Sequence, residues 1–317
     1  MRVQVILNPW ADRGRGATQA ELIQRVAQPY GGVDLVQTQR PGHAIELARQ
    51  AADDGYDLVV AAGGDGTISD VVNGLMRGSK AITKLGIIPI GSGNDLAWSL
   101  KISTDVATAV HQLFSGTPKT IDLARIEDDQ GRFRIVDNNI GIGFDAIVVI
   151  ATENITRVHG FLMYLTATLR TIATYSQMPK ITAYFDDEKV EQSIMLIAFG
   201  VGPRGGGGFL LTPFAKQDDD LVDTCTANKM GRLSMIGLLL KVFNGSHVHS
   251  KRITMRQNKQ IRVRADRPMP IHTDGEMFAY PQDNVREVTI TSLPAAIEVI
   301  VSGEIGDYRV EILEDNL

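Results

Sequence analysis

Residues 58–67 read Leu-Val-Val-Ala-Ala-Gly-Gly-Asp-Gly-Thr, and this stretch decides the fold of the first part of the chain. The apolar run predicts a buried strand, and residues 68–76 follow with apolar side chains at helical spacing. Glycines between a strand and a helix let backbone N–H groups approach a ligand, and a helix start favours negative charge. The stretch therefore predicts a phosphate-binding loop; a tight turn with a solvated Asp65 is the plainer alternative.

The same alternation continues on both sides of this stretch. Strand-like runs at residues 3–7, 33–38, 58–62 and 85–90 alternate with helix-like runs at residues 17–28, 44–52 and 68–76. Such alternation is typical of a doubly wound α/β domain, in which helices cover both faces of a parallel sheet. Ligands bind at the carboxyl ends of the strands in these sheets.

Two further loops at predicted strand ends are rich in glycine and polar residues. Residues 91–95 read Gly-Ser-Gly-Asn-Asp, and residues 8–16 contain two arginines that can meet phosphate oxygens. Neither loop has the spacing of a P-loop or of a dinucleotide-binding motif. Because like charges repel, Asp65 is expected to hold a Mg²⁺ ion that bridges phosphates rather than to contact phosphate directly.

The pattern changes after residue 120, where short strand-like segments separated by turn residues dominate. Only two helices are predicted there, at residues 161–174 and 233–243. An antiparallel β-sandwich or barrel is expected. We therefore predict an α/β nucleotide-binding domain over residues 1–121 and a β-sandwich domain over residues 122–301. The acidic tail, about residues 302–317, is expected to pack back on the first domain or to hang loose.

Composition excludes several classes of protein. The 317 residues carry a net charge of −5, which gives no reason to expect a nucleic-acid partner. The single Cys225 rules out a disulfide framework and a cysteine-based zinc cluster. No signal peptide or membrane-spanning run is visible, so a cytoplasmic protein is expected, which meets a membrane only from outside.

Two acidic motifs of the second half are candidates for chemistry. Asp274-Gly275-Glu276 is typical of a hairpin turn, and Glu276 is a candidate functional carboxylate directly after that turn. Residues 218–220 are three aspartates, which suit a hard cation or a solvated turn. Residues 161–164, Phe-Leu-Met-Tyr, are either a lipid-facing patch or, as helical spacing favours, part of the core.

Taken together, and in this order along nearly the whole chain, these motifs resemble the diacylglycerol kinase catalytic-domain family, which includes sphingosine and ceramide kinases. The Gly-Gly-Asp-Gly-Thr element is shared with NAD kinases, whereas residues 91–95 and Asp274-Gly275-Glu276 favour the lipid kinases. The resemblance also covers residues 139–146, Asn-Ile-Gly-Ile-Gly-Phe-Asp-Ala, the glycine run at residues 205–208, and residues 215–221.

The resemblance implies an NAD-kinase-like nucleotide domain, a β-sandwich on the lipid side, and ATP and Mg²⁺ as cofactors, with the site between the domains. Glu276 would be the general base, and Asp65 and Asp95 would belong to the Mg²⁺–phosphate network. The nucleotide-site residues implied are Asn8, Pro9, Trp10, Ala11, Asp12, Thr38, Gly63, Gly64, Asp65, Gly66, Thr67, Ser92 and Asn94. A structural Mg²⁺ would lie at Asp219 and the carbonyl oxygens of Lys216 and Leu221.

This chain departs from the family pattern at a few positions. Ser92 stands where threonine is usual, and Asp220 replaces the glycine expected after the paired aspartates, which costs positive-φ freedom beside the metal site.

The leading hypothesis is an ATP- and Mg²⁺-dependent kinase that phosphorylates a lipid hydroxyl, such as that of diacylglycerol, at a membrane surface. A sphingoid base, phosphatidylglycerol or another lipid alcohol stays open as the substrate. The alternatives are an NAD-kinase-like enzyme and a non-catalytic nucleotide- or lipid-binding protein. The partner is expected to be a membrane lipid, met peripherally, and a homodimer is left open.

Overall fold

The computed structural model describes residues 1–78, 83–155, 160–175 and 179–303, which form two compact units. The first unit comprises Met1–Ile121 and the described residues from Ala295 on, and the second comprises Asp122–Pro294. The sequence analysis placed residues 122–301 in one domain, whereas the contacts assign the end of the last strand to the first unit. Residues 304–317, most of the acidic tail, lie outside the described residues.

The first unit is built on a parallel sheet in the order β2-β1-β3-β4, with the end of β15 beside β4. The strands are β1 (Val3–Leu7), β2 (Asp34–Gln37), β3 (Leu58–Gly63), β4 (Lys84–Pro89) and β15 (Glu287–Val301). Every residue of β3 is buried, as expected for the central strand of a sheet covered on both faces.

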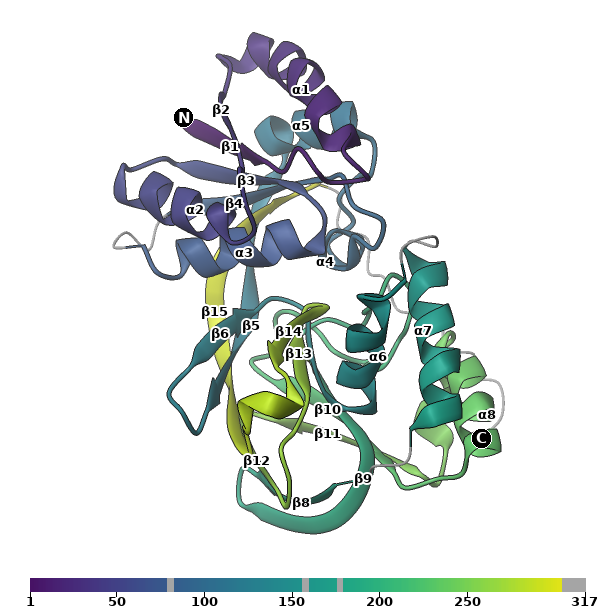
Figure 1. Ribbon diagram of the computed structural model, residues 1–317. Coiled ribbons are helices and arrows are strands. Elements are labelled where there is room, and N and C mark those ends of the chain that lie inside the picture. The colour runs from purple at the N-terminus through teal and green to yellow at the C-terminus, as the bar shows by residue number, and fades with distance from the viewer. Residues whose placement is uncertain (79–82, 156–159, 176–178, 304–317) are drawn as a thin grey trace. The chain divides into compact units, whose positions relative to one another are not determined.

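Helices cover both faces of this sheet. Figure 1 shows α1 and α5 on one face and α2 and α3 on the other. The helices are α1 (Ala20–Ala27), α2 (His43–Asp53), α3 (Asp65–Leu75), α4 (Asp95–Ser99) and α5 (Val106–Ser115), with short 3₁₀ turns at Arg15–Gln19 and Gln28–Tyr30. The predicted doubly wound α/β fold is therefore confirmed.

The second unit consists mainly of antiparallel strands. They are β5 (Thr117–Asp128), which begins in the first unit, β6 (Phe133–Val136), β7 (Asn139–Gly143), β8 (Lys180–Phe185), β9 (Glu188–Gly200), β10 (Val222–Asn228), β11 (Ile253–Asn258), β12 (Gln260–Ala265), β13 (Ile271–Thr273), β14 (Glu276–Ala279) and the first part of β15. The first half of β9 pairs with β8, and its second half pairs with β7 and β10, so one long strand joins two sets of strands.

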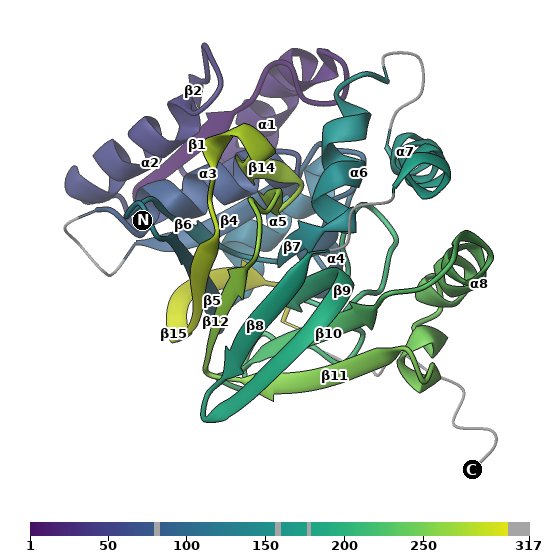
Figure 2. The ribbon, with the colours of Figure 1, turned by 60° about the horizontal axis from the view of Figure 1, so that its bottom comes forward.

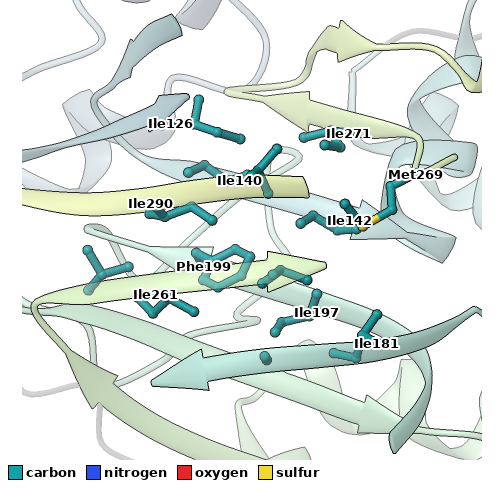
Figure 3. Close-up of a cluster of buried hydrophobic side chains, with 14 of the residues drawn as sticks. Ile126, Ile140, Ile142, Ile181, Ile197, Phe199, Ile261, Met269, Ile271 and Ile290 are labelled. Carbon is teal, nitrogen blue, oxygen red and sulfur yellow. The ribbon is translucent and has the colours of Figure 1, made fainter. Parts of the chain in front are cut away.

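The main core of the second unit lies between these strands. Ile140 and Ile142 of β7, Phe199 of β9 and Ile261 of β12 point into the same cluster (Figure 3), and each is almost completely buried. At roughly 25 cal/mol per Å² of buried apolar surface, such a cluster is the main favourable term in the folding of this unit.

Three helices cover one side of the second unit: α6 (Phe144–Thr152), α7 (Phe161–Thr174) and α8 (Arg232–Val242). They enclose a second apolar cluster that includes Ala167, Ile172, Met235 and Leu238. The predicted helix at residues 161–174 agrees with α7, and α8 differs from its prediction by one residue. None of the helices within the described ranges is long and apolar enough to cross a bilayer.

Some predicted elements differ from the structure. The strand expected at residues 133–139 is two strands, β6 and β7, because Asp137 and Asn138 form a turn between them. The strands expected at residues 286–292 and 296–301 are one strand, β15, although Pro294 lies within it. Helices α5 and α6 did not stand out in the sequence pattern.

Close packing of α2 against α3 provides a stability test. A Cβ atom at Gly74 of α3 would lie 2.5 Å from the carbonyl oxygen of Ile45 and 2.6 Å from the Cβ atom of Ala48. We expect Gly74→Ala to lower the free energy of unfolding by about 1–3 kcal/mol, because neither contact is with a flexible side-chain end. Urea denaturation measures the change.

Gly237 is the matched control. It lies in the exposed face of α8, and nothing lies within 4 Å of the position its Cβ atom would take. Gly237→Ala should therefore raise the free energy of unfolding by about 0.5–1 kcal/mol, the usual gain for alanine in a helix. Equal effects of the two substitutions would contradict the close contact of α2 and α3.

Candidate active site

The carboxyl ends of four strands of the first unit bring the predicted nucleotide loops to one edge of its sheet. Leu7 pairs with Ala62 and with Gln37, and Gly63 pairs with Pro89, so the four strands end at the same level. Backbone bonds continue the alignment into the loops, from Thr38 N–H to the Leu7 carbonyl and from Ile90 N–H to the Gly63 carbonyl. Loops far apart in the sequence thus lie next to one another.

Asp65 joins two of these loops. One carboxylate oxygen accepts a hydrogen bond of 2.8 Å from the backbone N–H of Asn94, and the other accepts one of 2.6 Å from the N–H of Asp95. Gly93 lies against the same carboxylate: a Cβ atom at this position would lie 2.5 Å from Oδ2, so a side chain there would clash. Asp65 therefore orders the start of α4, a task that the sequence did not indicate.

Small residues allow the loops after β3 and β4 to touch. A Cβ atom at Gly91 would lie 2.5 Å from the Cα atom of Gly64. Gly63 has the hydroxyl of Thr67 against it in the same way. That hydroxyl in turn accepts a 3.0 Å hydrogen bond from the side-chain amide of Asn8, which ties the loop after β1 to the start of α3.

The remaining residues predicted for the nucleotide site fall into three groups. Asn94 bonds back to the backbone of Gly91 through both side-chain atoms and has a left-handed backbone, while Asp95 is buried beside it. Asp12 pairs with Arg15 at 2.8 Å within its own loop. Exposed or half-buried along this edge are Pro9, Trp10, Gly66 and Ser92, whereas Ala11 is buried.

In the second unit, Glu276 begins β14, directly after a two-residue turn. Asp274 and Gly275 both have positive φ values, 50° and 78°, which is the backbone of the hairpin turn that Asp-Gly favours. The side chain of Glu276 is exposed, and its Oε2 atom lies 2.7 Å from Nη2 of Arg134 on β6. Asp274 and Gly275 therefore form the turn of a hairpin, and Glu276 presents an exposed carboxylate directly after that turn.

Asp274 is a structural carboxylate. Its Oδ1 atom accepts hydrogen bonds from the backbone N–H groups of Asn138, at 3.1 Å, and Asn139, at 2.9 Å, while Oδ2 accepts one of 3.3 Å from Asp137. Its own N–H donates to the Asn139 carbonyl. The side chain is buried, so it fixes the β6–β7 turn against the hairpin that carries Glu276.

Two polar residues missed by the sequence analysis adjoin this hairpin. His272 of β13 is buried, and its Nε2 atom lies 3.0 Å from Oδ2 of Asp145, the second residue of α6. Both side chains pass over Gly141, where a Cβ atom would overlap them. Arg134 is the other side-chain partner that was missed. Neither His272 nor Arg134 lies in a glycine-flanked motif, and their partners are more than 120 residues away in sequence.

The acidic loop at residues 218–223 is ordered by backbone hydrogen bonds. Asp219 accepts one from the N–H of Leu221, and Asp122 accepts one from the N–H of Asp220. Burial, and then the charges of Asp122 and Asp218, raise the pKa of Asp219. Burial also raises the pKa of Asp223 to about 6. Across the described residues, no three His, Cys, Asp or Glu side chains are grouped to hold a metal ion.

Asp220 stands where the resemblance predicts a glycine. Its φ value is 66°, so the backbone keeps the left-handed conformation that glycine favours, although Asp220 carries a side chain. The glycine run at residues 205–208 is a packed turn, closed by hydrogen bonds between Gly205 and Phe209. Gly206 lies against Phe209, and Gly208 lies against Phe161 of α7. Phe161 is half-buried, with its ring packed against Phe209, and Met163 and Tyr164 pack against the second apolar cluster, whereas Leu162 is exposed.

The role of Asp274 can be tested by its removal. Asp274→Ala should lower the free energy of unfolding by about 2–4 kcal/mol, because it leaves several buried backbone N–H groups without an acceptor. Thermal denaturation followed by circular dichroism measures the loss. Asp187, exposed in the β8–β9 turn, is the control, and Asp187→Ala should change stability by less than about 0.5 kcal/mol. Equal stability of the two variants would contradict the structural role.

Family models match both parts of the chain. Residues 2–126 match the diacylglycerol kinase catalytic domain, and residues 138–301 match the YegS C-terminal NAD kinase beta sandwich-like domain.

Relatives match over nearly their whole length. The diacylglycerol kinase of Mycobacterium tuberculosis is 29% identical over 303 residues, 94% of each chain. The probable YegS-like lipid kinase of Stenotrophomonas maltophilia is 30% identical over 287 residues, 87% of this chain and 89% of its own. The crystal structure of a diacylglycerol kinase from Bacillus anthracis shares the fold, with a TM-score of 0.72, 20% identity, and coverage of 95% and 97% of the two chains.

The two family models together span most of the chain, and the two relatives match it across both of these regions. The chain therefore belongs to the family of diacylglycerol kinases and YegS-like lipid kinases.

Proposed function

We propose that this chain transfers the terminal phosphoryl group of ATP to the hydroxyl group of a membrane lipid, with Mg²⁺ as cofactor. The observation that carries the proposal is Glu276, an exposed carboxylate on a hairpin that is fixed from beneath by Asp274. A lipid kinase needs such a group to take a proton from an alcohol. An NAD kinase shares the nucleotide domain but gives Asp274-Gly275-Glu276 no comparable task.

The nucleotide would lie along the edge where the loops after β1, β3 and β4 meet. Backbone N–H groups of residues 64–66, where the eleven-residue helix α3 begins, suit phosphate oxygens. Asn8, Thr38 and Ser92 would contribute polar groups at the same edge. Asp65 and Asp95 provide carboxylate oxygens suited to Mg²⁺, which would neutralise phosphate charge when bound.

The proposed reaction needs little covalent chemistry from the protein. The lipid oxygen forms a bond to the terminal phosphorus atom, the bond from that phosphorus to ADP breaks, and the hydroxyl proton passes to Glu276. The ion pair with Arg134 holds the Glu276 side chain in one orientation, which places its oxygen for that proton.

A structural Mg²⁺ ion at Asp219, with the carbonyl oxygens of Lys216 and Leu221, is part of this proposal. Asp219 is half-buried next to Asp122 and Asp218, and burial together with the charges of these carboxylates raises its pKa. A divalent cation would offset that repulsion, and its preferred ligands are oxygen atoms of this kind. The left-handed backbone at Asp220 is the one that glycine supplies elsewhere in the family, so Asp220 keeps the loop's shape.

Diacylglycerol is the substrate that we propose, because relatives that match nearly the whole chain bear that name. A sphingoid base and phosphatidylglycerol present the same chemical group and are the substrates to compare with it. The test is ADP production from ATP and Mg²⁺ with each lipid in mixed micelles, and with NAD. We expect diacylglycerol to stimulate ADP release and NAD to have no effect. Stimulation by NAD alone would move the protein to the other kinase class.

The general base is tested by Glu276→Gln, which keeps the shape of the side chain and removes its basicity. Turnover should fall by about 10²- to 10⁴-fold, the range expected for loss of a general base, while affinity for ATP with Mg²⁺ stays unchanged. Lipid-dependent ADP release and calorimetric titration of the nucleotide measure the two quantities.

The control is Glu191→Gln on β9, a chemically identical change at an exposed glutamate that pairs with Lys189. Its turnover should equal that of the parent. Full activity of Glu276→Gln would exclude Glu276 as the base, even if lipid phosphorylation itself were demonstrated.

A further inference from the structure

Helices α7 and α8 expose large apolar side chains on the surface of the second unit. The exposed fractions are 87% for Leu233 and 67% for Leu240 on α8, and 59% for Leu162 on α7. Ile236 and Leu169 are also exposed. Single exposed apolar residues are common on protein surfaces, but a group on neighbouring helices marks an interaction site.

The apolar residues of α8 occupy two opposite faces. Met235, Leu238, Leu239 and Val242 pack into the core beneath the helix. Leu233, Ile236 and Leu240 follow one another at intervals of three and four residues, so they share the face that points away from that core. A surface helix of a globular protein normally carries polar residues on that face. Packing within the second unit therefore does not explain why these three outward side chains are apolar.

The exposed face continues from α8 to α7. The two helices lie side by side (Figure 2), and the ring of Phe161 at the start of α7 contacts the ring of Phe243 just after α8, with 5.6 Å between centroids. Leu162 directly follows Phe161, and Leu240 lies three residues before Phe243. The exposed leucines Leu162 and Leu240 thus lie on neighbouring helices, each within three residues of this ring contact.

The segments that carry this face contain basic residues but no acidic ones. Residues 229–252 contain no Asp or Glu, and α7 contains none either, although the whole chain has a net charge of −5. On α8, Arg232 and Lys241 are exposed and lie on opposite sides of the Leu233–Ile236–Leu240 stripe, given about 100° of rotation per residue. The other basic residues of this segment are Lys229, Lys251 and Arg252.

We propose that the exposed face of α8, together with that of α7, docks on a lipid bilayer that contains anionic lipids. An apolar stripe with basic residues at its sides is the pattern by which a helix lies in a membrane interface. The inference rests on the proposed function, since a lipid kinase must reach a substrate that stays in the bilayer. A second copy of the chain fits less well, because it would bring two basic faces together.

The test is co-sedimentation of the whole chain with large vesicles, without nucleotide. We expect binding to vesicles of equal parts phosphatidylglycerol and phosphatidylcholine, and much weaker binding to phosphatidylcholine alone. The double variant Leu233→Ser/Leu240→Ser should weaken binding to the anionic vesicles by about tenfold or more. Lys241→Glu, which keeps the apolar stripe, should weaken it and reduce its dependence on salt.

Two control variants match these changes away from the docking face. Met76→Ser replaces an exposed apolar residue of the first unit, and Arg264→Glu reverses an exposed charge on β12. Neither should alter vesicle binding. Unchanged binding of the double variant, or no binding of the parent to anionic vesicles, would overturn the proposal. So would a dimeric parent that becomes monomeric in the double variant, as measured by sedimentation velocity.

Activity separates this inference from the proposed function. With lipid embedded in vesicles, the double variant should lose activity in proportion to its loss of binding. With a short-chain diacylglycerol dissolved as monomers, it should turn over like the parent. If the parent phosphorylates no lipid but binds vesicles through α8, the docking surface stands and the proposed function fails. If the parent is active and the double variant still binds vesicles, the docking surface fails alone.

Discussion

The loops after β3 and β4 meet at one edge of the sheet of the first unit. Their arrangement there depends on one interaction, between the Asp65 carboxylate and the backbone N–H groups of Asn94 and Asp95. A carboxylate that accepts bonds from two successive amides fixes the start of α4 to the start of α3. The same two loops also touch where Gly91 meets Gly64, with no room for a Cβ atom at residue 91. Without the Asp65 carboxylate, β3 and β4 would still pair in the sheet, but these two hydrogen bonds between the loops at their ends would be lost.

In the second unit, too, a carboxylate that accepts hydrogen bonds from successive backbone N–H groups connects two loops. The carboxylate of Asp274 accepts bonds from the amides at residues 137–139, and so ties the β6–β7 turn to the β13–β14 hairpin. Each aspartate belongs to a glycine-flanked motif that sequence analysis would assign to chemistry. Burial and backbone partners distinguish Asp274 from Glu276, which is exposed and pairs with an arginine side chain. Two carboxylates separated by one glycine thus have different surroundings, one buried and bonded to backbone amides and one exposed at the surface.

Helices α7 and α8 show that the spacing of apolar residues in a sequence does not by itself tell which of them are buried. Both helices contain apolar residues at the spacing of a core helix, and most of these do pack inward. The outward leucines of α8 have no such explanation within the second unit. Docking on a bilayer, as we propose, would explain a helix that is apolar on both faces, because its outer face would then meet lipid rather than water.

The sequence by itself determined the class of fold, the order of the glycine loops and the hairpin turn at Asp274-Gly275 before Glu276. These features are local: strand and helix periodicity, glycine at positive φ, and the turn that Asp-Gly favours are all readable from neighbouring residues. The pairing of Arg134 with Glu276, of His272 with Asp145, and of Asp65 with the loop after β4 was decided only by tertiary structure. Each of these contacts joins residues from different strands or helices, and no periodicity in a single chain records which side chains the folded backbone brings together.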